Sequence, residues 1–372
     1  FQLNALSKMR PFIKGEGGGR IGLVHNGSPL FTGDAGSGES EIRRHILEHD
    51  YLDAIVALPS DIFYNTGIAT YLWFMTNRKP NERKGKVILI DASDMGSLMK
   101  KNLGKKRYEI SADSQRRIVK AYHDFKDVEW ADEGGAAGRR RSLKAKVLPA
   151  SHFFYRKVTV ERPLRLRFDL NRAKVDGFIA GLAAKPGKTG ASIDVQNLAA
   201  ALTRYVTDHG DKVFMSMDAF MTAINKGDAA NSKDLKQKAT KFKSKVLETA
   251  RKAFGIRDKK AEIVTDEDGS ALPDSELRDA EYIPFSVLGK SGDLVTGIDA
   301  YFDAEVKPHW PDAWINTSTR DSTDEMVGIV GCEINFNREF YTYEQPRGRQ
   351  AIKHDIEAME KRFMQMLKEV VA

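Results

Sequence analysis

Three residue patterns in this sequence match or nearly match the spacing of known reactive sites, and the first is a glycine cluster. Gly17, Gly19 and Gly22 fit G-x-G-x-x-G, by which a backbone loop holds a dinucleotide. Such a loop must follow a strand and precede a helix, whereas here the glycines come before an apolar run that starts at Arg20. We therefore interpret them as a turn in front of a strand.

The second pattern, GLAAKPGKT at residues 181–189, is similar to a loop that holds phosphate with backbone N–H groups and a lysine. Its first glycine is one residue too far from Gly187, and no predicted strand leads into it. The third is His45, Glu48 and His49, spaced as H-x-x-E-H, and two histidines four apart can share a metal ion. Because no third ligand is evident, we expect a solvated polar face and no bound metal. A metal hydrolase is the weakest of the functions considered.

Composition narrows the function classes. The 372 residues are 41% hydrophobic and 30% charged, with a formal net charge of +7, which suits a globular protein of two or three domains with an anionic partner. Nucleic acid is the commonest such partner, although an enzyme can simply be basic. No run approaches the roughly 20 apolar residues of a membrane helix. Cys332 is the only cysteine, so no internal disulfide forms, and we expect a cytoplasmic protein without a secretory signal.

The first 125 residues read as α/β. We predict four strands and two helices, at residues 20–26, 52–58, 68–75 and 87–90 and at residues 40–48 and 111–125. Strands this apolar are usually covered on both faces, which favours a largely parallel sheet. Leu3, Leu6 and Ile13 recur at near-helical spacing, as if a buried helix began upstream, so we expect the chain to be a fragment.

The rest of the chain divides into three further parts. Residues 126–170 form a basic loop and a β arm, with a strand pair or an extended arm at residues 153–166. Residues 171–300 form a helical region, with its best helix at residues 232–254, followed by a turn-rich connector. Residues 300–372 form a tail whose last helix carries a heptad seam. Six apolar residues at spacings of four and three form this seam: Ile352, Ile356, Met359, Phe363, Met366 and Val370.

Four stretches resemble the modification subunits of type I restriction–modification systems, which are adenine-N6 DNA methyltransferases. They are GGRIGLVHNGSPLF from residue 18, residues 42–74 including LDAIVALPSDIFYNTGIATYLWF, YRKVTVERPLRL from residue 155, and YFDAEVKPHWPDAWI from residue 301 with VGCEINFNREFYTY and the last helix. The resemblance implies a Rossmann-like methyltransferase sheet, S-adenosylmethionine as methyl donor, double-stranded DNA as substrate, and a specificity subunit as partner. A restriction or translocase subunit can join the same assembly.

The family's donor loop and its Asn/Asp-Pro-Pro-Tyr/Phe catalytic motif are missing from this sequence, which has no Pro-Pro pair. In the family both lie upstream of the segment that matches Gly18. We therefore expect no catalytic residue within these 372 residues, and the fragment alone to be inactive. The alternative is a non-catalytic DNA-binding and assembly module that docks on a specificity subunit.

The resemblance also suggests which residues contact the target base. The family swings the adenine out of the duplex and holds it against aromatic faces. Phe63 and Tyr64, with Asn65 in the turn that exposes them, are placed where related enzymes have a stacking aromatic. Their structural alternative is a core Phe63 and a strand-edge Tyr64. A weaker candidate is the strand end at His25, Asn26 and Gly27, where open α/β sheets bind ligands.

DNA backbone contact is expected from a cluster that we call the basic arm: Arg139, Arg140, Arg141, Lys144, Lys146, Arg156 and Lys157. Such a cluster contacts phosphate and gives salt-sensitive affinity that is blind to sequence. The alternative is a disordered charged loop, above all at Arg139, Arg140 and Arg141. In the family a separate specificity subunit reads the DNA sequence, and the heptad seam fits the task of binding that subunit.

Overall fold

The computed structural model describes residues 1–14, 17–132, 141–183, 193–229, 244–266, 268–288, 294–343 and 345–371. The chain forms two compact units, which we call the sheet unit and the second unit. The sheet unit comprises Phe1–Gly33, Ile42–Phe153 and Glu333–Ala372, and the second unit comprises Asp34–Glu41 and Phe154–Cys332. Among the described residues, no helix is long and apolar enough to cross a membrane.

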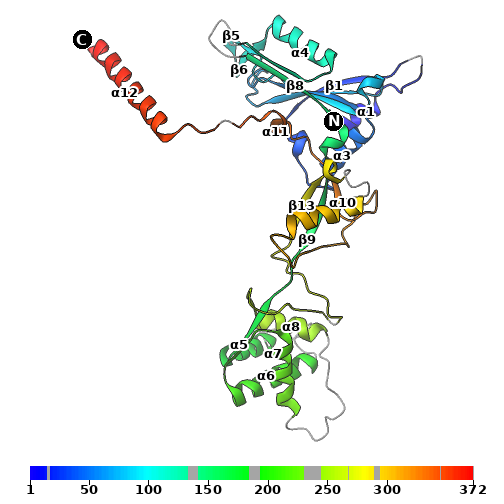
Figure 1. The fold of residues 1–372 in the computed structure, drawn as a ribbon, viewed down its shortest axis with the longest axis vertical. Coiled ribbons are helices and arrows are strands. Elements are labelled where there is room, and N and C mark those ends of the chain that lie inside the picture. Colours follow the sequence, from blue (N-terminus) through cyan, green and yellow to red (C-terminus); the bar gives the residue numbers. More distant parts are fainter. Residues whose placement is uncertain are drawn as a thin grey trace. The chain divides into compact units, whose positions relative to one another are not determined.

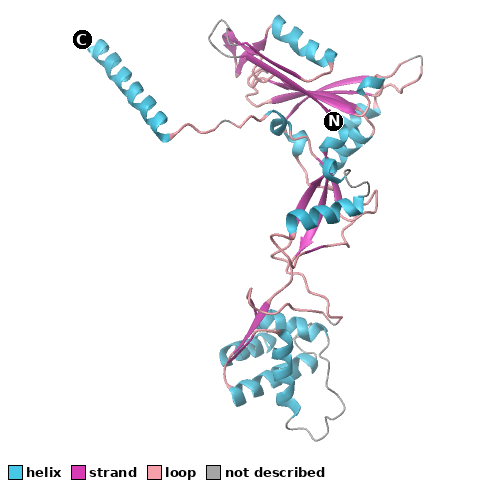
Figure 2. Ribbon diagram, viewed as in Figure 1, coloured by secondary structure: helices cyan, strands magenta, loops and turns pink. Residues whose placement is uncertain are grey.

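The sheet unit is built on a six-stranded sheet in the order β1-β3-β2-β4-β8-β7 (Figures 1 and 2). Its strands are β1 (Arg20–Asn26), β2 (Leu52–Leu58), β3 (Thr70–Thr76), β4 (Lys86–Asp91), β7 (Val128–Asp132) and β8 (Arg141–Pro149). Only β2 and β4 pair in parallel, and every other pairing is antiparallel. The prediction of a largely parallel sheet is therefore wrong, because burial on both faces restricts which side chains a strand carries and not its direction.

The core of this unit forms where the most apolar strands lie in the middle of the sheet. All seven residues of β2 are buried, as are Val87–Ile90 of β4. Helix α4 (Ala112–Asp124) covers one face with Ile118 and Tyr122. Its start is fixed by Ser111, whose side chain accepts a hydrogen bond from the Ser114 N–H at 3.2 Å. Each buried aliphatic side chain contributes about 1.5–3 kcal/mol to folding.

Two segments of the sheet unit differ from expectation. The basic segment after residue 140 is strand β8. It pairs with β4 from Lys144 to Pro149 and with β7 from Arg141 to Ala145, so it belongs to the sheet rather than to a loop. Helix α1 (Gln2–Ser7) ends well before Ile13, which instead forms an isolated bridge with Gly17. The glycines before β1 form the predicted turn, in which the Gly19 N–H donates to the Asn77 side chain at 2.9 Å.

Smaller elements complete the sheet unit: α2 (Ser28–Phe31), the part of α3 (Gly38–Glu48) from Ile42 onward, the 3-10 turns Asn81–Arg83 and Ala150–Phe153, the hairpin strands β5 (Gly96–Leu103) and β6 (Lys106–Ile110), α11 (Phe336–Phe340) and α12 (Arg349–Val371). Helix α3 begins two residues before the predicted start, and α12 has the predicted position. Among the described residues, β1 pairs only with β3, so it forms an edge of the sheet. Val24, in the middle of β1, is 53% exposed.

The second unit is organised around β9 (Phe154–Glu161), the strand that the predicted β arm forms. It pairs antiparallel with β13 (Asp279–Pro284), β14 (Trp314–Ile315) and β15 (Ile329–Cys332). Val158 of β9 packs with Ile283, Leu288 and Ile298, which belong to β13, α9 (Phe285–Leu288) and α10 (Leu294–Tyr301). The β arm is therefore a central strand with partners from the carboxy-terminal part of the chain.

The predicted helical region is also present in the second unit. Helices α5 (Arg172–Ala183), α6 (Ile193–His209), α7 (Met217–Ala229) and α8 (Ser244–Phe254) pack on a small sheet of β10 (Leu166–Leu170), β11 (Lys212–Phe214) and β12 (Gly255–Arg257). Phe168 and Phe220 stack at 4.8 Å between ring centroids within this core. The described part of the predicted helix 232–254 is α8.

Candidate functional site

The carboxyl ends of three strands meet at one edge of the six-stranded sheet. Strands β1 and β2 both run antiparallel to β3, and Asn26 and Leu58 both lie opposite Thr70. The two strand ends are therefore separated by two strand spacings, about 10 Å. Strand β4 runs parallel to β2, and its last residue, Asp91, pairs with Ala57 at the same edge. In open α/β sheets this edge is where ligands bind.

A loop that we call the aromatic loop, residues 59–69, leaves the sheet at the end of β2 and returns as β3. Asp61 and Asn65 have positive φ angles of 58° and 56°, which turn the backbone sharply on both sides of Phe63 and Tyr64. The Thr66 N–H donates to the Phe63 carbonyl at 3.3 Å and closes the turn. Phe63 is 37% exposed and Tyr64 62% exposed, so the expected alternative of a core Phe63 does not describe this loop.

His25 and Asn26 end strand β1, and Gly27 follows at the start of α2. The His25 ring lies edge-on to Trp73 at 6.2 Å between centroids, and its buried Nε2 has no hydrogen-bond partner among the described residues. Burial lowers the pKa of His25, which favours its neutral imidazole form. Tyr71 of β3 lies opposite His25 of β1 in the sheet. Burial raises the pKa of Tyr71, and the Asp91 carboxylate adds to this shift. This second candidate group therefore lies beside the aromatic loop at the same edge.

The hairpin of β5 and β6 rests on the aromatic loop and was not predicted. The Asp61 carbonyl accepts the backbone N–H groups of Arg107 at 2.9 Å and of Tyr108 at 3.2 Å. Gly104, at the hairpin turn, has φ +61°, and a Cβ there would lie 2.9 Å from the Tyr64 ring and 2.7 Å from Asn65 Oδ1. A side chain at Gly104 would therefore push the hairpin off Tyr64. The glycine between two alternating runs was the signal that could have revealed this turn.

Most described cations of the basic arm have partners within their own unit. Arg141 pairs with Asp132 at 2.7 Å, and Lys144 with Glu129 at 3.6 Å. Lys146 donates to the Glu339 carbonyl. Lys144 and Lys146 line a recess together with residues 339–342. Arg139 and Arg140 lie outside the described residues.

Arg156 and Lys157 of the basic arm lie on β9 in the second unit. The Arg156 guanidinium is 0% exposed and donates to Asp324 and to the Val327 carbonyl at 3.2 Å. The expectation of a phosphate contact fails for Arg156, because no part of its side chain reaches the surface. Lys157 forms an ion pair with Asp34. This contact lowers the pKa of Asp34 and raises the pKa of Lys157.

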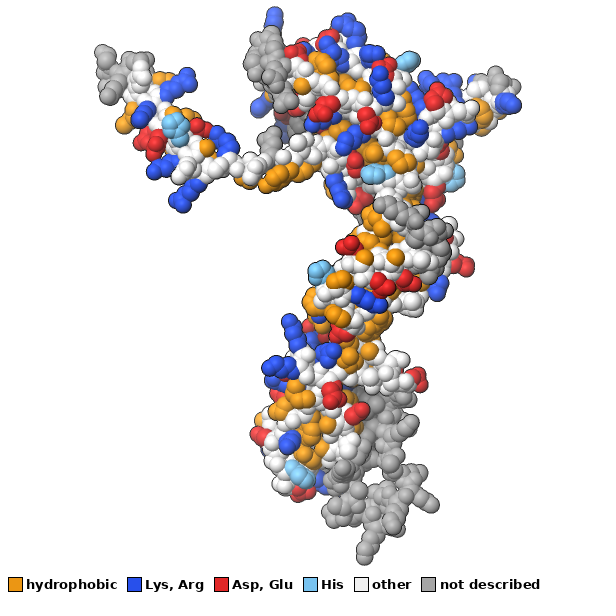
Figure 3. Space-filling model, viewed as in Figure 1, with side chains coloured by type: hydrophobic (Ala, Val, Ile, Leu, Met, Phe, Trp, Pro, Cys, Tyr) orange, Lys and Arg blue, Asp and Glu red, His pale blue; other side chains and the backbone are white. Residues whose placement is uncertain are grey.

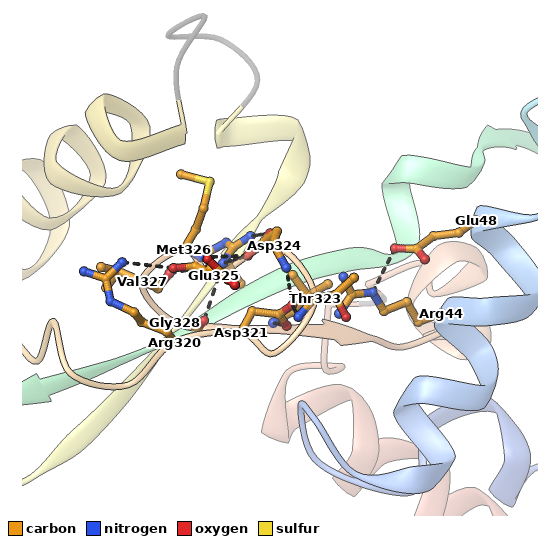
Figure 4. Close-up of polar contacts among 12 residues, drawn as sticks. Arg44, Glu48, Arg320, Asp321, Thr323, Asp324, Glu325, Met326, Val327 and Gly328 are labelled. Atoms are coloured by element: carbon orange, nitrogen blue, oxygen red, sulfur yellow. Dashed lines mark hydrogen bonds and ion pairs between the residues drawn. The ribbon is translucent and has the colours of Figure 1, made fainter.

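The loop that holds Arg156 is Arg320–Gly328 (Figure 4). The Asp321 carboxylate accepts the Thr323 N–H at 2.9 Å, and Arg320 donates to the Glu325 carbonyl at 2.9 Å. The Val330 N–H donates to Asp321 at 2.9 Å, which joins the loop to β15. Figure 4 also shows Arg44 and Glu48 of α3, which form an ion pair at 2.8 Å one helical turn apart. The loop is therefore built by internal hydrogen bonds that keep a guanidinium buried.

Five seam residues of α12 have described side chains, and all of them are exposed. Their exposed fractions lie between 41% for Ile352 and 67% for Met359, and Ile356, Phe363 and Met366 fall between these values. The side chain of Val370 lies outside the described residues. Hydrophobic side chains are visible on the surface of α12 among its charged residues (Figure 3). An apolar stripe of this length on one helix fits a partner helix.

The described residues do not form a cluster of metal ligands. No group of three or more His, Cys, Asp or Glu side chains in the described ranges is placed to hold a metal ion. His45 and His49 lie with their rings 4.1 Å apart, and the His49 Nδ1 contacts the His45 carbonyl at 2.9 Å. The glycine cluster precedes β1 instead of following a strand, so it does not fit the donor loop that the family resemblance implies.

Comparison with known proteins finds similarity to the family that the sequence stretches resemble. Residues 12–136 match the family described as N-6 DNA Methylase. The chain is 34% identical over 110 residues to the type I restriction enzyme MjaVIII methylase subunit of Methanocaldococcus jannaschii, which is 30% of this chain and 18% of that protein. It is 30% identical over 122 residues to the HindI methylase subunit of Haemophilus influenzae, covering 33% of this chain and 26% of that protein.

Among solved structures, a type I restriction–modification methyltransferase subunit from Streptococcus thermophilus is similar at 24% identity and a TM-score of 0.28, covering 36% of this chain and 23% of that one. The chain therefore spans less than two thirds of the length of the relatives it matches. The sequence match covers the described sheet from β1 to β7 and the aromatic loop.

Proposed function

We propose that this chain, whose residues 12–136 match the N-6 DNA Methylase family, is part of the modification subunit of a type I restriction–modification system, and that the complete subunit methylates adenine N6 in double-stranded DNA. The observation that carries the proposal is the aromatic loop: the matched segment holds two exposed aromatic rings at the ligand-binding edge of its sheet. The role proposed for these residues is one wall of the pocket for the target base.

Chemistry makes such a wall necessary. The exocyclic amine of adenine is a poor nucleophile because its lone pair is delocalised into the ring, and it cannot be reached inside the duplex. The base must leave the stack and be held in one orientation. The exposed ring of Tyr64, with Phe63 beside it, supplies a face for this base, and stacking on an aromatic contributes about 1–3 kcal/mol. Neutral His25 and Asn26, at the same edge, supply polar groups for the base.

S-adenosylmethionine would supply an electrophilic methyl group on sulfonium sulfur. The described residues do not fit a site for it, since their glycine cluster lies before β1. We therefore assign no step of methyl transfer to these residues, and we place the donor loop and the Asn/Asp-Pro-Pro motif in a part of the protein outside this sequence. These residues then orient the base and exclude water from one side of it.

Helix α12 supports a second part of the proposal, assembly with a specificity subunit. Its five exposed seam residues repeat every three or four positions and match what a parallel or antiparallel helix partner would cover. Assembly would bring DNA sequence recognition from the partner, and a restriction or translocase subunit could join the same complex. We also place the complex in the cytoplasm, in agreement with the single cysteine.

The test of the pocket is methylation of duplex DNA by the complete modification subunit bound to its specificity subunit. Tyr64→Ala should lower the methylation rate by about 5–150-fold, the equivalent of about 1–3 kcal/mol of stacking. Tyr64→Phe keeps the ring and should retain the rate within about 3-fold. Full activity in both Tyr64→Ala and Phe63→Ala would remove these residues from the pocket.

The donor argument has a test of its own. Titration calorimetry of residues 1–372 with S-adenosylmethionine should give no micromolar binding, whereas the complete subunit should bind it. Micromolar binding by residues 1–372 would show that a donor site exists within them and would overturn the assignment.

A second candidate function is a non-catalytic DNA-binding and assembly module, which the exposed seam of α12 favours. Met359→Asp with Phe363→Asp should abolish co-purification with the specificity subunit and leave the sheet unit folded. Ala358→Asp with Lys361→Asp adds two aspartates outside the seam and is the matched control. If the seam variant retains the partner, α12 does not dock there. If it loses the partner while the complete wild-type complex methylates nothing, the non-catalytic module is supported.

A further inference from the structure

We propose that the hairpin of β5 and β6 binds the phosphodiester backbone of duplex DNA beside the aromatic loop. We call it the basic hairpin, defined by Lys100, Lys101, Lys105, Lys106 and Arg107. The proposal rests on the proposed function, because it places the phosphates next to the base that the aromatic loop would hold. None of these five residues belongs to the basic arm.

The shape of the hairpin turns its cations outward. Leu103 lies opposite Lys106 across a two-residue turn at Gly104 and Lys105. The register then shifts between Leu98 and Leu103, so four residues of β5 lie across from Arg107 alone. Such a bulge bends the strand and points its extra side chains away from the ladder. Lys100 and Lys101 lie in this bulge and are exposed.

The five cations form no ion pair or side-chain hydrogen bond with any residue in the described ranges. Five of the eight residues at positions 100–107 are basic, and Lys100, Lys101, Lys105 and Arg107 are exposed. Like charges this close repel one another, and a polyanion relieves the repulsion when it binds. Most described cations of the basic arm form ion pairs or hydrogen bonds within the protein, whereas these five cations have no such partner in the described ranges.

The hairpin is fixed to the aromatic loop at three points. A Cβ on Gly96 would lie 3.1 Å from Pro59, the Asp61 carbonyl accepts two N–H groups of β6, and Gly104 lies against Tyr64 and Asn65. The cations are therefore held beside Tyr64 by backbone contacts rather than by flexible side chains. A nucleotide stacked on Tyr64 keeps its own flanking phosphates, which are the anions nearest to these cations.

Two exposed leucines on the hairpin, Leu98 at 67% and Leu103 at 57%, could instead suit a membrane surface. A hairpin with leucines and lysines has the chemistry of an interfacial anchor. DNA is favoured because the hairpin is bonded to a loop with exposed aromatic rings, and because residues 12–136, which contain both, match a DNA methylase family. Binding to vesicles is therefore one outcome of the test.

The experiment measures binding of the purified chain to a fluorescein-labelled duplex of about 30 base pairs by anisotropy, over a range of NaCl concentrations. Each phosphate contact contributes about 0.9 to the slope of log Kd against log salt. Lys100→Gln with Lys101→Gln and Lys105→Gln should lower this slope by about 2–3. Between about 50 and 200 mM NaCl, the parent should lose roughly 40-fold more affinity than this triple variant.

Two control variants make the result specific. Lys212→Gln with Lys259→Gln and Lys260→Gln removes the same charge from exposed lysines of the second unit and should leave the slope unchanged. Lys100→Arg with Lys101→Arg and Lys105→Arg keeps the charge and should retain the parent slope. Circular dichroism checks that all three variants remain folded. An equal loss of slope in the second-unit variant would show that net charge alone sets the affinity, and would overturn the proposal.

Further outcomes separate this proposal from the proposed function. A parent chain without salt-dependent duplex binding, or one that binds phosphatidylserine vesicles through the hairpin and not DNA, overturns the hairpin proposal. If the complete complex methylates adenine and the hairpin variant keeps its salt slope, only the hairpin proposal fails. If the hairpin variant loses slope but the complete complex has no methylation activity, the hairpin proposal stands and the proposed function fails.

Discussion

The basic hairpin and the basic arm are both clusters of lysine and arginine, but the cations of the arm are mostly paired and those of the hairpin are not paired within the described ranges. In the arm, Arg141, Lys144 and Lys157 have carboxylate partners, and Arg156 is buried against Asp324. In the hairpin, within the described ranges, the five cations have no such partner. The comparison shows that a run of basic residues in a sequence indicates charge but not whether that charge is free to bind DNA. Local pairing decides this, and pairing depends on contacts between distant residues.

The largest expected difference between the two regions is in the free energy of unfolding, and it is expected on substitution of Arg156. Arg156→Gln should lower the free energy of unfolding by about 3 kcal/mol, because it leaves Asp324 and two carbonyls without their buried donor. Arg107→Gln, on the hairpin, should change it by less than about 0.5 kcal/mol. Urea unfolding measures both variants. If Arg156→Gln kept full stability but weakened DNA binding, the arm arginine would be a DNA contact after all.

The next largest effect on stability is expected where the hairpin contacts the aromatic loop. Gly104→Ala should lower stability by about 1–2 kcal/mol, since a Cβ there is strained by positive φ and lies within 3 Å of Tyr64 and Asn65. Gly85→Ala is a matched control, because Gly85 has φ +67° with no atom within 4 Å of its Cβ position. Urea unfolding of the two variants separates contact from strain. Equal losses would show that the hairpin does not press on the loop.

A smaller effect sharpens the contrast in DNA binding. Lys144→Gln with Lys157→Gln should change the slope of log Kd against log salt by less than about 0.9, because both cations already have carboxylate partners. Lys100→Gln with Lys105→Gln removes the same charge and should change it by about 1.8. Fluorescence anisotropy with the same duplex compares the two pairs. A larger change from the arm pair would reverse the assignment of the two regions.

The smallest effect is the pH dependence of the Asp34–Lys157 pair. Lys157 lowers the pKa of Asp34, so the pair contributes stability above the unfolded value near 4, and this contribution is lost as pH falls through the lower folded pKa. The raised pKa of Lys157 makes the contribution disappear again as pH rises above about 10.4. Asp34→Asn should therefore be less stable by at most about 1 kcal/mol between pH 5 and 9, since Asp34 is more than half exposed.

Thermal unfolding at several pH values measures this difference. The parent and Asp34→Asn should converge as the pH falls through the lowered pKa of Asp34, and again as the pH rises through the raised pKa of Lys157. A difference that stays constant down to pH 2.5 would mean that the two side chains do not interact in solution.

The sequence predicts best the elements whose burial is local. The apolar runs at β1 and β2 give the strands with their observed bounds, and Ser111 marks the start of α4. Strand direction was not predictable, because β3 enters between β1 and β2 from a later part of the chain. Strand β8 was taken for a loop because its alternating lysines face outward, while Leu143 and Ala145 face the core.

Of the candidate site, the aromatic loop was found and its hairpin was not. Phe63 and Tyr64 follow an apolar strand and precede a turn, and both are local signals. The contact with the hairpin joins Asp61 to Arg107, and such a pairing leaves no trace in either segment alone. The burial of Arg156 depends in the same way on a loop more than 160 residues later.

The unpaired side of β1 predicts that these 372 residues associate with one another in solution. Among the described residues, the outer edge of β1 presents unpaired backbone N–H and C=O groups beside the exposed Val24. Such groups can form hydrogen bonds with a strand of another molecule. Solutions of the chain should contain dimers or larger oligomers whose proportion rises with concentration, and a polypeptide that adds a strand there should dissociate them. Sedimentation velocity at several concentrations would show the effect, and Val24→Lys should reduce it.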